Sequence, residues 1–380
     1  MKIKVNTATW KKALKKALSL VGNASGNPKE NCIGIIIQED NSYLEVLESG
    51  VHNTIIKLKD IVIEEEGFCY LQYNSLKSLD SQTITLKEFE ISLNNNNLIY
   101  SVEEFGAISE PIFHDQDPFQ GMKFDQNNFE LLEEGSTPLV KLLNTGVKSF
   151  SDTTEDKTKT VVNIILDEEN SIMSGVISNS TATGLVYNFT SNSSTDFTIR
   201  TELIKNVSFL FENEESVKLE KNNNTLKITS DKGESVLQIN GANKDSINYL
   251  SASFKTEADS LMLLDADKLK AIVKWQSYGN ENGGCISIYS EEDKLLIKGD
   301  KTEEASSLAY EEINPFNLIK LPTELLLGAV NCIPKDVPLT LKVTTQKVAN
   351  RDNLIKTGLL IYEEQDYTGT AYLSEPALLN

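Results

Sequence analysis

One pattern occurs three times along the chain: an apolar strand, an acidic turn and a second apolar strand. The copies begin at residues 33–41, 161–170 and 285–293. The corresponding glutamates in their turns are 129 and 123 residues apart. That period is far longer than the roughly 20 to 50 residues of a solenoid repeat, but it suits a whole domain. The pattern therefore predicts three copies of one domain in series.

Length and composition agree with this prediction. The chain has 380 residues, and its apolar content of 39% can fill several cores. Pro111 and Pro118 interrupt the strand pattern after the first copy, which indicates a linker near residues 113–121. A second linker is expected near residues 246–259. The predicted domains are therefore 1–115, 122–246 and 257–380.

Each predicted domain divides again into two halves with the order strand, helix, strand pair. In the first domain the helices are expected at residues 7–21 and 73–81, and in the middle domain at 137–151 and 201–212. In the last domain they are expected at 266–278 and 323–332. Each helix would pack on the sheet formed by its neighbouring strands. The predicted fold class is α+β, with three tandem copies of a doubled strand-helix-strand-strand unit.

Several functional classes find no support in the sequence. The first residues enter a strand pattern rather than a signal peptide, and no apolar run approaches the ~20 residues of a membrane span. A cytoplasmic protein without a membrane partner is expected. The two histidines, His52 and His114, belong to no recognisable triad, nucleotide-binding loop or metal spacing. We therefore expect no enzyme activity, no cofactor and no metal. The four cysteines, which lack CxxC spacing, are expected to be buried thiols: Cys32, Cys69, Cys285 and Cys332.

Charge is distributed unevenly between helices and the rest of the chain. The chain carries 36 Lys and Arg against 56 Asp and Glu, a formal net charge of -20. Yet the first helix of every predicted domain is basic. These helices combine an apolar stripe at helical spacing with lysines on the opposite face. The lysines are Lys11, Lys12, Lys15, Lys16, Lys141, Lys148, Lys270 and Lys274.

For a single helix, solvated lysines opposite a buried stripe are the ordinary interpretation. Three equivalent basic helices in so acidic a chain favour a shared electropositive surface instead. The lysines are not interleaved with aromatic residues as a single-strand stacking platform requires, and no arginine-rich recognition helix is present. The prediction is therefore sequence-independent contact with phosphates.

These features together resemble the bacterial-type β sliding clamp, the DNA polymerase III β subunit family. The resemblance covers the whole chain and is carried by patterns rather than by a chemical signature. They are an opening strand at residues 1–5 followed directly by a helix, and hairpins at 35–44, 164–173 and 288–297. A strand at 317–321 that enters a helix at Thr323 completes the set.

The resemblance implies that two chains join head to tail into a ring that encloses double-stranded DNA. Basic helices would line the hole and acidic hairpins would face outward, so that the clamp tethers a replicative DNA polymerase and is opened by a clamp loader. Closure of such a homodimer would bury sheet edges left unpaired in one chain. The contacts expected at that interface are Leu98, Tyr100, Trp275 and Tyr278.

Members of the family recruit partners through an apolar pocket between the second and third domains. The matching positions here are Val162, Thr183, Gly184, Leu185, Pro376, Ala377, Leu378 and Leu379. Both flanking segments depart from the family pattern. Residues 179–185 read NSTATGL where Asp-Gly-His-Arg-Leu is familiar, and the tail ends EPALLN instead of Met-Pro-Met-Arg-Leu. These departures favour a divergent clamp, such as one encoded by a phage or a plasmid. A terminal strand packed into the third domain is the alternative for Leu378 and Leu379.

Two other functions stay open at this point. The Asn, Ser and Thr content also suits an acidic, β-rich structural or surface-interaction protein without a DNA function. Such a protein would be a monomer or an open array. A clamp-like decoy or regulator would keep the ring but bind different partners.

Overall fold

The fold is described from a computed structural model of the whole chain. The structure describes residues 1–21, 27–81, 87–103, 105–114, 116–125, 127–135, 161–166, 171–176, 184–189, 193–214, 216–242, 257–278, 284–292, 294–309, 311–312, 318–333, 335–347, 354–364 and 367–374. These residues form two compact units, one of residues 1–136 and 206–239, the other of residues 137–205 and 240–380. Each unit is described by itself.

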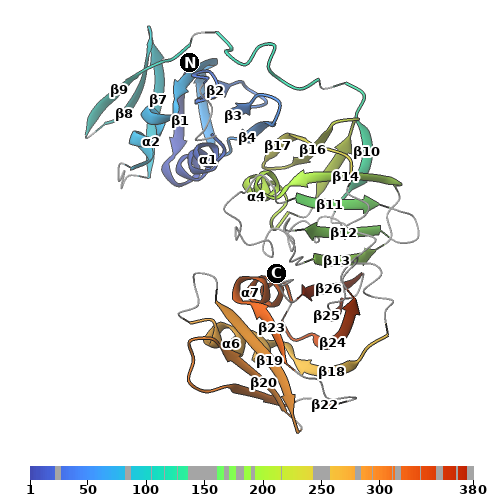
Figure 1. The fold of residues 1–380 in the computed structure, drawn as a ribbon. Helices are drawn as coiled ribbons and strands as arrows, with labels where there is room; N and C mark the ends of the chain where they lie inside the picture. The colour runs from blue at the N-terminus through green and yellow to red at the C-terminus, as the bar shows by residue number, and fades with distance from the viewer. Residues whose placement is uncertain are drawn as a thin grey trace. The chain divides into compact units, whose positions relative to one another are not determined.

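The first unit contains a five-stranded sheet and two helices that pack on each other (Figure 1). Its strand order is β5 (Ile61–Glu65), β1 (Lys2–Asn6), β7 (Glu88–Asn94), β8 (Asn97–Val102) and β9 (Gly106–Pro111). The helices are α1 (Thr7–Leu20) and α2 (Tyr73–Ser81), each of which follows a strand directly. The predicted order of strand, helix and strand pair is therefore confirmed for this part of the chain.

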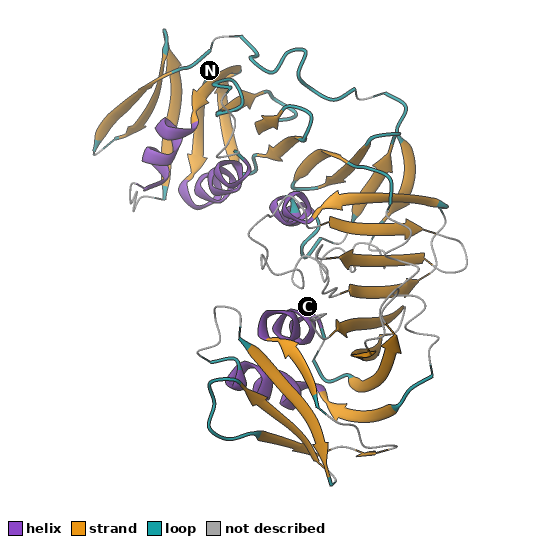
Figure 2. Ribbon diagram, viewed as in Figure 1, coloured by secondary structure: helices purple, strands orange, loops and turns teal. Residues whose placement is uncertain are grey.

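An eight-stranded sheet completes the first unit (Figure 2). Its order is β10 (Glu130–Glu134), β15 (Val217–Lys221), β16 (Thr225–Ser230), β17 (Gly233–Gln238), β4 (His52–Lys57), β3 (Tyr43–Glu48), β2 (Cys32–Ile37) and β6 (Gly67–Gln72). The antiparallel pairing of β17 with β4 joins strands from two predicted domains. Strand edges that are free in one repeat are thus paired by the next.

The second unit has a similar construction around a nine-stranded sheet. Its order is β14 (Thr195–Arg200), β11 (Val161–Leu166), β12 (Ser171–Val176), β13 (Gly184–Phe189), β26 (Tyr367–Ser374), β25 (Leu354–Glu364), β24 (Pro338–Lys347), β18 (Ser260–Asp265) and β22 (Glu311–Glu312). Here the antiparallel pair of β13 and β26 connects the middle and last thirds of the sequence. The β-strands of the predicted middle domain are therefore shared between two sheets.

The second unit also contains a smaller sheet and the helices α6 (Ala266–Gln276) and α7 (Thr323–Cys332). A four-stranded sheet has the order β21 (Ser306–Ala309), β20 (Lys294–Gly299), β19 (Cys285–Glu291) and β23 (Ile319–Pro322). Helices α6 and α7 pack against each other. All three repeated hairpins of the sequence are present, as β2 with β3, β11 with β12, and β19 with β20.

One predicted helix is shorter than its sequence pattern indicated. We expected a helix over residues 201–212, but α4 (Thr201–Asn206) ends at Asn206, and a separate 3-10 turn, η2, covers Ser208–Leu210. Val207, Leu210 and Phe211 are all buried. After α4 the chain therefore buries these apolar side chains through a 3-10 turn instead of a continued α-helix.

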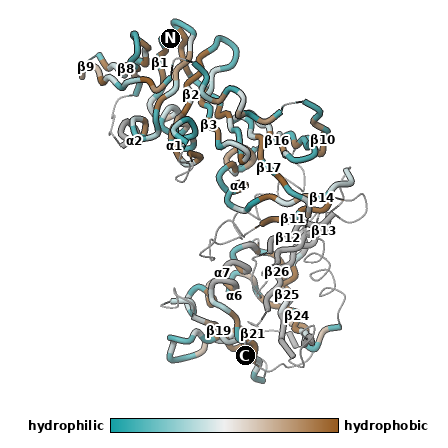
Figure 3. The backbone as a smooth tube through the Cα atoms, turned by 45° about the horizontal axis from the view of Figure 1, so that its top comes forward, coloured by the Kyte–Doolittle hydropathy of each residue, from teal (hydrophilic) through white to brown (hydrophobic). Residues whose placement is uncertain are grey.

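The core of the first unit forms where α1 lies on its sheets. Trp10 of α1 makes edge contacts with Phe89 and Tyr100, each at a centroid distance of 6.4 Å. The sequence predicts an apolar stripe on this helix formed by Trp10, Ala13, Leu14, Ala17, Leu18 and Val21. All of these residues are buried except Leu18, which is half-buried, and Leu20 is buried as well. Figure 3 shows hydrophilic and hydrophobic residues following each other along α1 and its neighbouring strands.

The segment predicted as the first linker packs tightly on the first unit. Phe119 is completely buried with Cys32, Leu47 and Tyr70, and its ring meets Tyr70 edge-on at 5.4 Å. Lys123 then pairs with the buried Glu45 at 2.7 Å and with Asp117 at 3.1 Å. Of the two prolines that indicated a linker, Pro111 ends β9 and Pro118 begins the turn that carries Phe119. The buried Phe119 fixes this segment to the first unit.

The buried His52 side chain contacts the end of α1 and a neighbouring hydroxyl group. Its Nε2 lies 3.2 Å from the carbonyl oxygen of Leu20, at the end of α1, and its Nδ1 lies 3.3 Å from the Thr54 hydroxyl. That hydroxyl is in turn 2.7 Å from the Ser235 hydroxyl on β17. The histidine therefore satisfies one of the open carbonyls at a helix terminus and belongs to the junction of β4 with β17.

The thiols follow their predicted burial in part. Cys32 and Cys69 are buried and free, and burial raises the pKa of each to about 12. Cys285, the first residue of β19, is only half-buried. The side chain of Cys332 lies outside the described residues.

Candidate nucleic-acid interface

Helix α1 begins at a defined cap. The Asn6 side-chain oxygen accepts hydrogen bonds from the backbone N–H groups of Ala8 and Thr9, at 3.0 and 3.3 Å. Such a cap satisfies donors that have no partner within the helix. With the start of the helix held here and Trp10 and Leu14 buried, the lysines are confined to the other face.

The four predicted lysines of α1 differ in exposure. Lys12 and Lys15 are exposed, whereas Lys11 and Lys16 are half-buried. Lys16 places its ammonium group 4.4 Å from the centroid of the Phe209 ring. A cation over an aromatic face is attracted by the ring quadrupole, so Phe209 holds Lys16 in place.

The pKa of Lys16 is lowered to about 8, first because burial disfavours its charged form. The positive charges of Lys12 and Lys232 lower it further, and Glu214 and Glu212 offset part of the effect. Lys232 itself pairs with Glu214 at 2.7 Å and donates to the Glu212 carbonyl oxygen at 2.8 Å. Lysines from α1 and from the turn before β17 thus lie close enough to repel one another.

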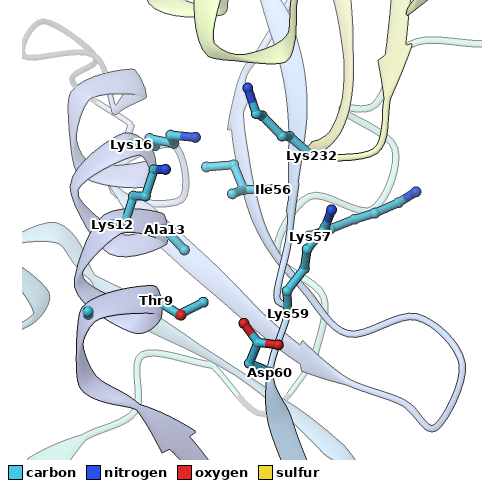
Figure 4. Close-up of a pocket in the computed structure, with 10 residues that line it drawn as sticks. Thr9, Lys12, Ala13, Lys16, Ile56, Lys57, Lys59, Asp60 and Lys232 are labelled. Atoms are coloured by element: carbon cyan, nitrogen blue, oxygen red, sulfur yellow. The ribbon is translucent and has the colours of Figure 1, made fainter. Parts of the chain in front are cut away.

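A basic pocket of about 400 Å³ lies beside this lysine group (Figure 4). Residues from α1, from β4 and the turn after it, and from the turn before β17 line it: Ala8, Thr9, Lys12, Ala13, Lys16, Ile56, Lys57, Lys59, Asp60 and Lys232. In Figure 4 the Lys57 side chain runs away from α1, as strand alternation requires when its neighbour Ile56 is buried. We call the remaining lysines Lys12, Lys16, Lys59 and Lys232 the pocket lysines.

The pairing of β4 with β17 brings Lys232 to the pocket. The Lys57 N–H donates to the Lys232 carbonyl oxygen at 2.9 Å, and Gly233 pairs with Ile56 in the next register position. Gly233 has a φ of 146°, and a Cβ there would lie 2.0 Å from the Ile55 carbonyl oxygen. Only glycine fits so close an approach of two backbones.

Solved structures with the same fold are known. No protein-family model matches the sequence, and no curated protein matches it significantly. The structure nevertheless superposes over its whole length on the β subunit from the DNA polymerase of Streptococcus pyogenes, with a TM-score of 0.75 at 12% identity, covering 99% of this chain and 100% of that one. Its fold is that of the β sliding clamps.

Other solved clamps give the same result. The DNA polymerase sliding clamp from Bacillus subtilis aligns with a TM-score of 0.74 at 11% identity over 98% of each chain. The DNA polymerase III β subunit from Thermotoga maritima aligns with a TM-score of 0.72 at 12% identity over 100% of each chain. The predicted α+β clamp fold is confirmed, and the low identity marks a divergent sequence.

The other predicted lysines differ in their exposure to solvent. On α6, Lys274 is exposed, but Lys270 is half-buried and donates a short hydrogen bond to the carbonyl oxygen of Ile333, at the end of α7. Lys270 thus provides a hydrogen-bond donor to a carbonyl group at the C-terminal end of α7. Lys141 and Lys148 lie outside the described residues.

The predicted partner pocket is only partly described. Val162 is buried in β11, and Gly184 and Leu185 begin β13, which pairs with β26. Thr183 and the four tail positions Pro376, Ala377, Leu378 and Leu379 lie outside the described residues. The pocket therefore stays a prediction.

The structure corrects one side of the predicted dimer contact. Leu98 and Tyr100 are 0% and 5% exposed. Both belong to β8, an inner strand between β7 and β9, and the Tyr100 ring makes an edge contact with Trp10. These side chains have no surface to offer a partner. Trp275 and Tyr278, by contrast, are 72% and 83% exposed at the end of α6.

One edge strand of that sheet is β9, which the sequence pattern did not predict. It is preceded by Phe105, which is 72% exposed, and carries Ile108, which is 37% exposed. The turn at residues 94–97 and the alternation after it indicated one hairpin, not a third strand. An exposed apolar strand edge is a natural pairing surface.

The described residues meet neither the requirements of a membrane-spanning helix nor those of a metal site. No described helix is long and apolar enough to span a membrane. Within the part of the chain that the structure describes, no group of three or more His, Cys, Asp or Glu side chains is arranged to hold a metal ion.

Proposed function

We propose that this protein is a DNA sliding clamp, a processivity factor that encircles duplex DNA and tethers a replicative polymerase. The observation that carries the proposal is the coincidence of a full-length clamp fold with a lysine face on α1. Lysines that contact phosphates without reading bases bind weakly and independently of sequence, and salt screens them. Such contacts permit sliding, and enclosure supplies the long residence that affinity alone does not. The proposed role needs no catalytic step.

Retention on closed DNA tests this function. The protein is loaded by a bacterial clamp loader onto nicked circular DNA, and its release is compared before and after the circle is linearised. A ring should stay on the circle and slide off the linear form. Equal release from both forms would refute a ring, and a monomer that behaves so would support the acidic structural protein instead.

The ring is proposed to be a head-to-tail homodimer. The edge of β9, with Phe105 and Ile108, would meet the end of α6, with Trp275 and Tyr278, on the second copy. In a single chain, both of these surfaces expose large apolar side chains. In a closed dimer the β9 edge of each copy would pack on the α6 end of the other, so two identical interfaces would bury all of these side chains.

Phe105→Asp and Trp275→Asp should each dissociate the dimer. Both side chains are mostly exposed, so a charge there leaves the fold intact but cannot be buried without cost. Light scattering should give twice 42.2 kDa for the parent and 42.2 kDa for the variants. Val62→Asp is the matched control, because Val62 is 61% exposed on β5, at the opposite edge of the same sheet. Dimers that persist in both variants, or a monomeric parent, would contradict the proposed interface.

Polymerase and clamp loader are proposed to bind at the partly described pocket around Val162. The three-domain division at 1–115, 122–246 and 257–380 is likewise retained as a proposal. Action on replicating DNA would place the protein in the cytoplasm. A decoy clamp would form the same ring but fail to stimulate a polymerase.

A further inference from the structure

We propose that the pocket beside α1 is a discrete binding site for one phosphate group, distinct from the diffuse lysine face of the helix. Either a phosphodiester of the DNA backbone or a free phosphate has the chemistry to occupy it. Only the DNA alternative rests on the proposed clamp function.

The first support is the convergence of charge. The pocket lysines come from three segments far apart in the sequence: α1, the turn after β4 and the turn before β17. Figure 4 shows Lys12 and Lys16 reaching from α1 toward the strand that carries Ile56, with Lys232 on the far side. A chain of net charge -20 has thus gathered like charges around one cavity.

The second support is that much of this charge is uncompensated. Lys232 is paired with Glu214, but within the described residues no carboxylate lies at ion-pair distance from Lys12, Lys16 or Lys59. Among the described residues that line the pocket, Asp60 is the one carboxylate. Repulsion among these lysines is what a bound anion would relieve, and a phosphate group accepts several charge-assisted hydrogen bonds at once.

The third support is the surroundings of Lys16. Its ammonium group is half-buried against Phe209 and faces Lys12 from its own helix, Lys232 from the β17 turn, and Glu212 and Glu214 from the segment after η2. In this setting the pKa of Lys16 is lowered to about 8. A bound anion favours the charged form, so binding and protonation of Lys16 are linked.

Recognition must come from the ammonium groups rather than from the start of the helix. The N–H groups of Ala8 and Thr9, which also line the pocket, already donate to Asn6. The apolar floor is provided by Ala13 and Ile56, both buried. An apolar floor under several lysines strengthens their attraction for an anion relative to open solvent.

Calorimetric titration of the full chain with inorganic phosphate, at constant ionic strength and pH 7, tests the site. One phosphate should bind per chain. Lys12→Ala/Lys59→Ala should weaken binding about tenfold, because two exposed charges that contact the anion are lost. Lys29→Ala/Lys87→Ala removes the same charge from exposed positions elsewhere in the first unit and should bind like the parent. Absent or non-saturable binding, or equal weakening by both variants, would overturn the proposal.

A pH series with sulfate isolates Lys16, because sulfate keeps its charge between pH 7 and 9. Affinity should fall severalfold across this range as Lys16 loses its proton. Unchanged affinity would overturn the part assigned to Lys16.

A short DNA duplex separates the two sources of phosphate. If the pocket takes the DNA backbone, Lys12→Ala/Lys59→Ala should reduce the slope of log affinity against log salt by about one or two, and the control should not. An unchanged slope together with weakened phosphate binding would assign the site to free phosphate. Because the calorimetry uses no DNA, a protein that fails as a clamp can still bind phosphate here, and the two failures are distinguishable.

Discussion

Lys12→Glu/Lys15→Glu is expected to shorten the residence of the protein on closed circular DNA on the order of tenfold or more. Both side chains are exposed on α1, and each substitution reverses a charge that would face phosphate. The change amounts to four charge units per chain, doubled in a dimeric ring. The loss should be largest at low salt, where phosphate contacts are least screened.

The fold should tolerate this change. Exposed helix charges contribute only tenths of a kcal/mol to stability, and the buried stripe of Trp10, Ala13 and Leu14 is untouched. Lys16 is left in place because a carboxylate there would approach Glu212 and Glu214. Denaturant midpoint and solution mass should therefore match those of the parent.

Lys29→Glu/Lys87→Glu provides the control of equal charge. Both lysines are exposed in the first unit but lie outside α1 and the pocket. Retention is measured by the decay of labelled protein from nicked circles after removal of free protein. If the control variant is lost from DNA as fast as the α1 variant, net charge rather than the helix face governs binding, and the assignment of α1 is wrong.

Gly233→Ala should destabilise the protein more than any surface substitution, by about 3 kcal/mol or more. The new Cβ would lie 2.0 Å from the Ile55 carbonyl oxygen, so β17 must move away from β4. That movement would break the pairing that joins strands from the first and second predicted domains. It would also displace Lys232 and the hydroxyl contact between Thr54 and Ser235.

Gly50→Ala separates the clash from backbone strain. Gly50 also has a positive φ, 69°, but a Cβ there would meet nothing within 4 Å. Its cost should stay near the ~1 to 2 kcal/mol of a left-handed residue. Urea unfolding monitored by circular dichroism gives both values. Similar losses for the two variants would mean that the approach of β17 to β4 is not what requires Gly233.

Local patterns in the sequence predicted much of the fold. Strand alternation around the three acidic turns located the hairpins, and helical spacing located α1, α2, α6 and α7 to within a few residues. These features depend on contacts between residues close in sequence, which periodicity records. The exposed lysines Lys12, Lys15 and Lys274 follow from the same spacing.

Only the tertiary structure decided which strands are edges and which lysines meet. The sequence pattern around Tyr100 is that of an edge strand. In the structure, however, β9 pairs with the strand of Tyr100, and Trp10 packs against the Tyr100 ring. Lys59 and Lys232 lie in turns without a helical pattern, and the pairing of β17 with β4 brings Lys232 to the pocket that Lys12 and Lys16 line. Pairing of strands more than 170 residues apart leaves no local periodicity. The basic face of α1 was therefore determined by sequence alone, whereas the pocket beside it exists only through long-range sheet pairing.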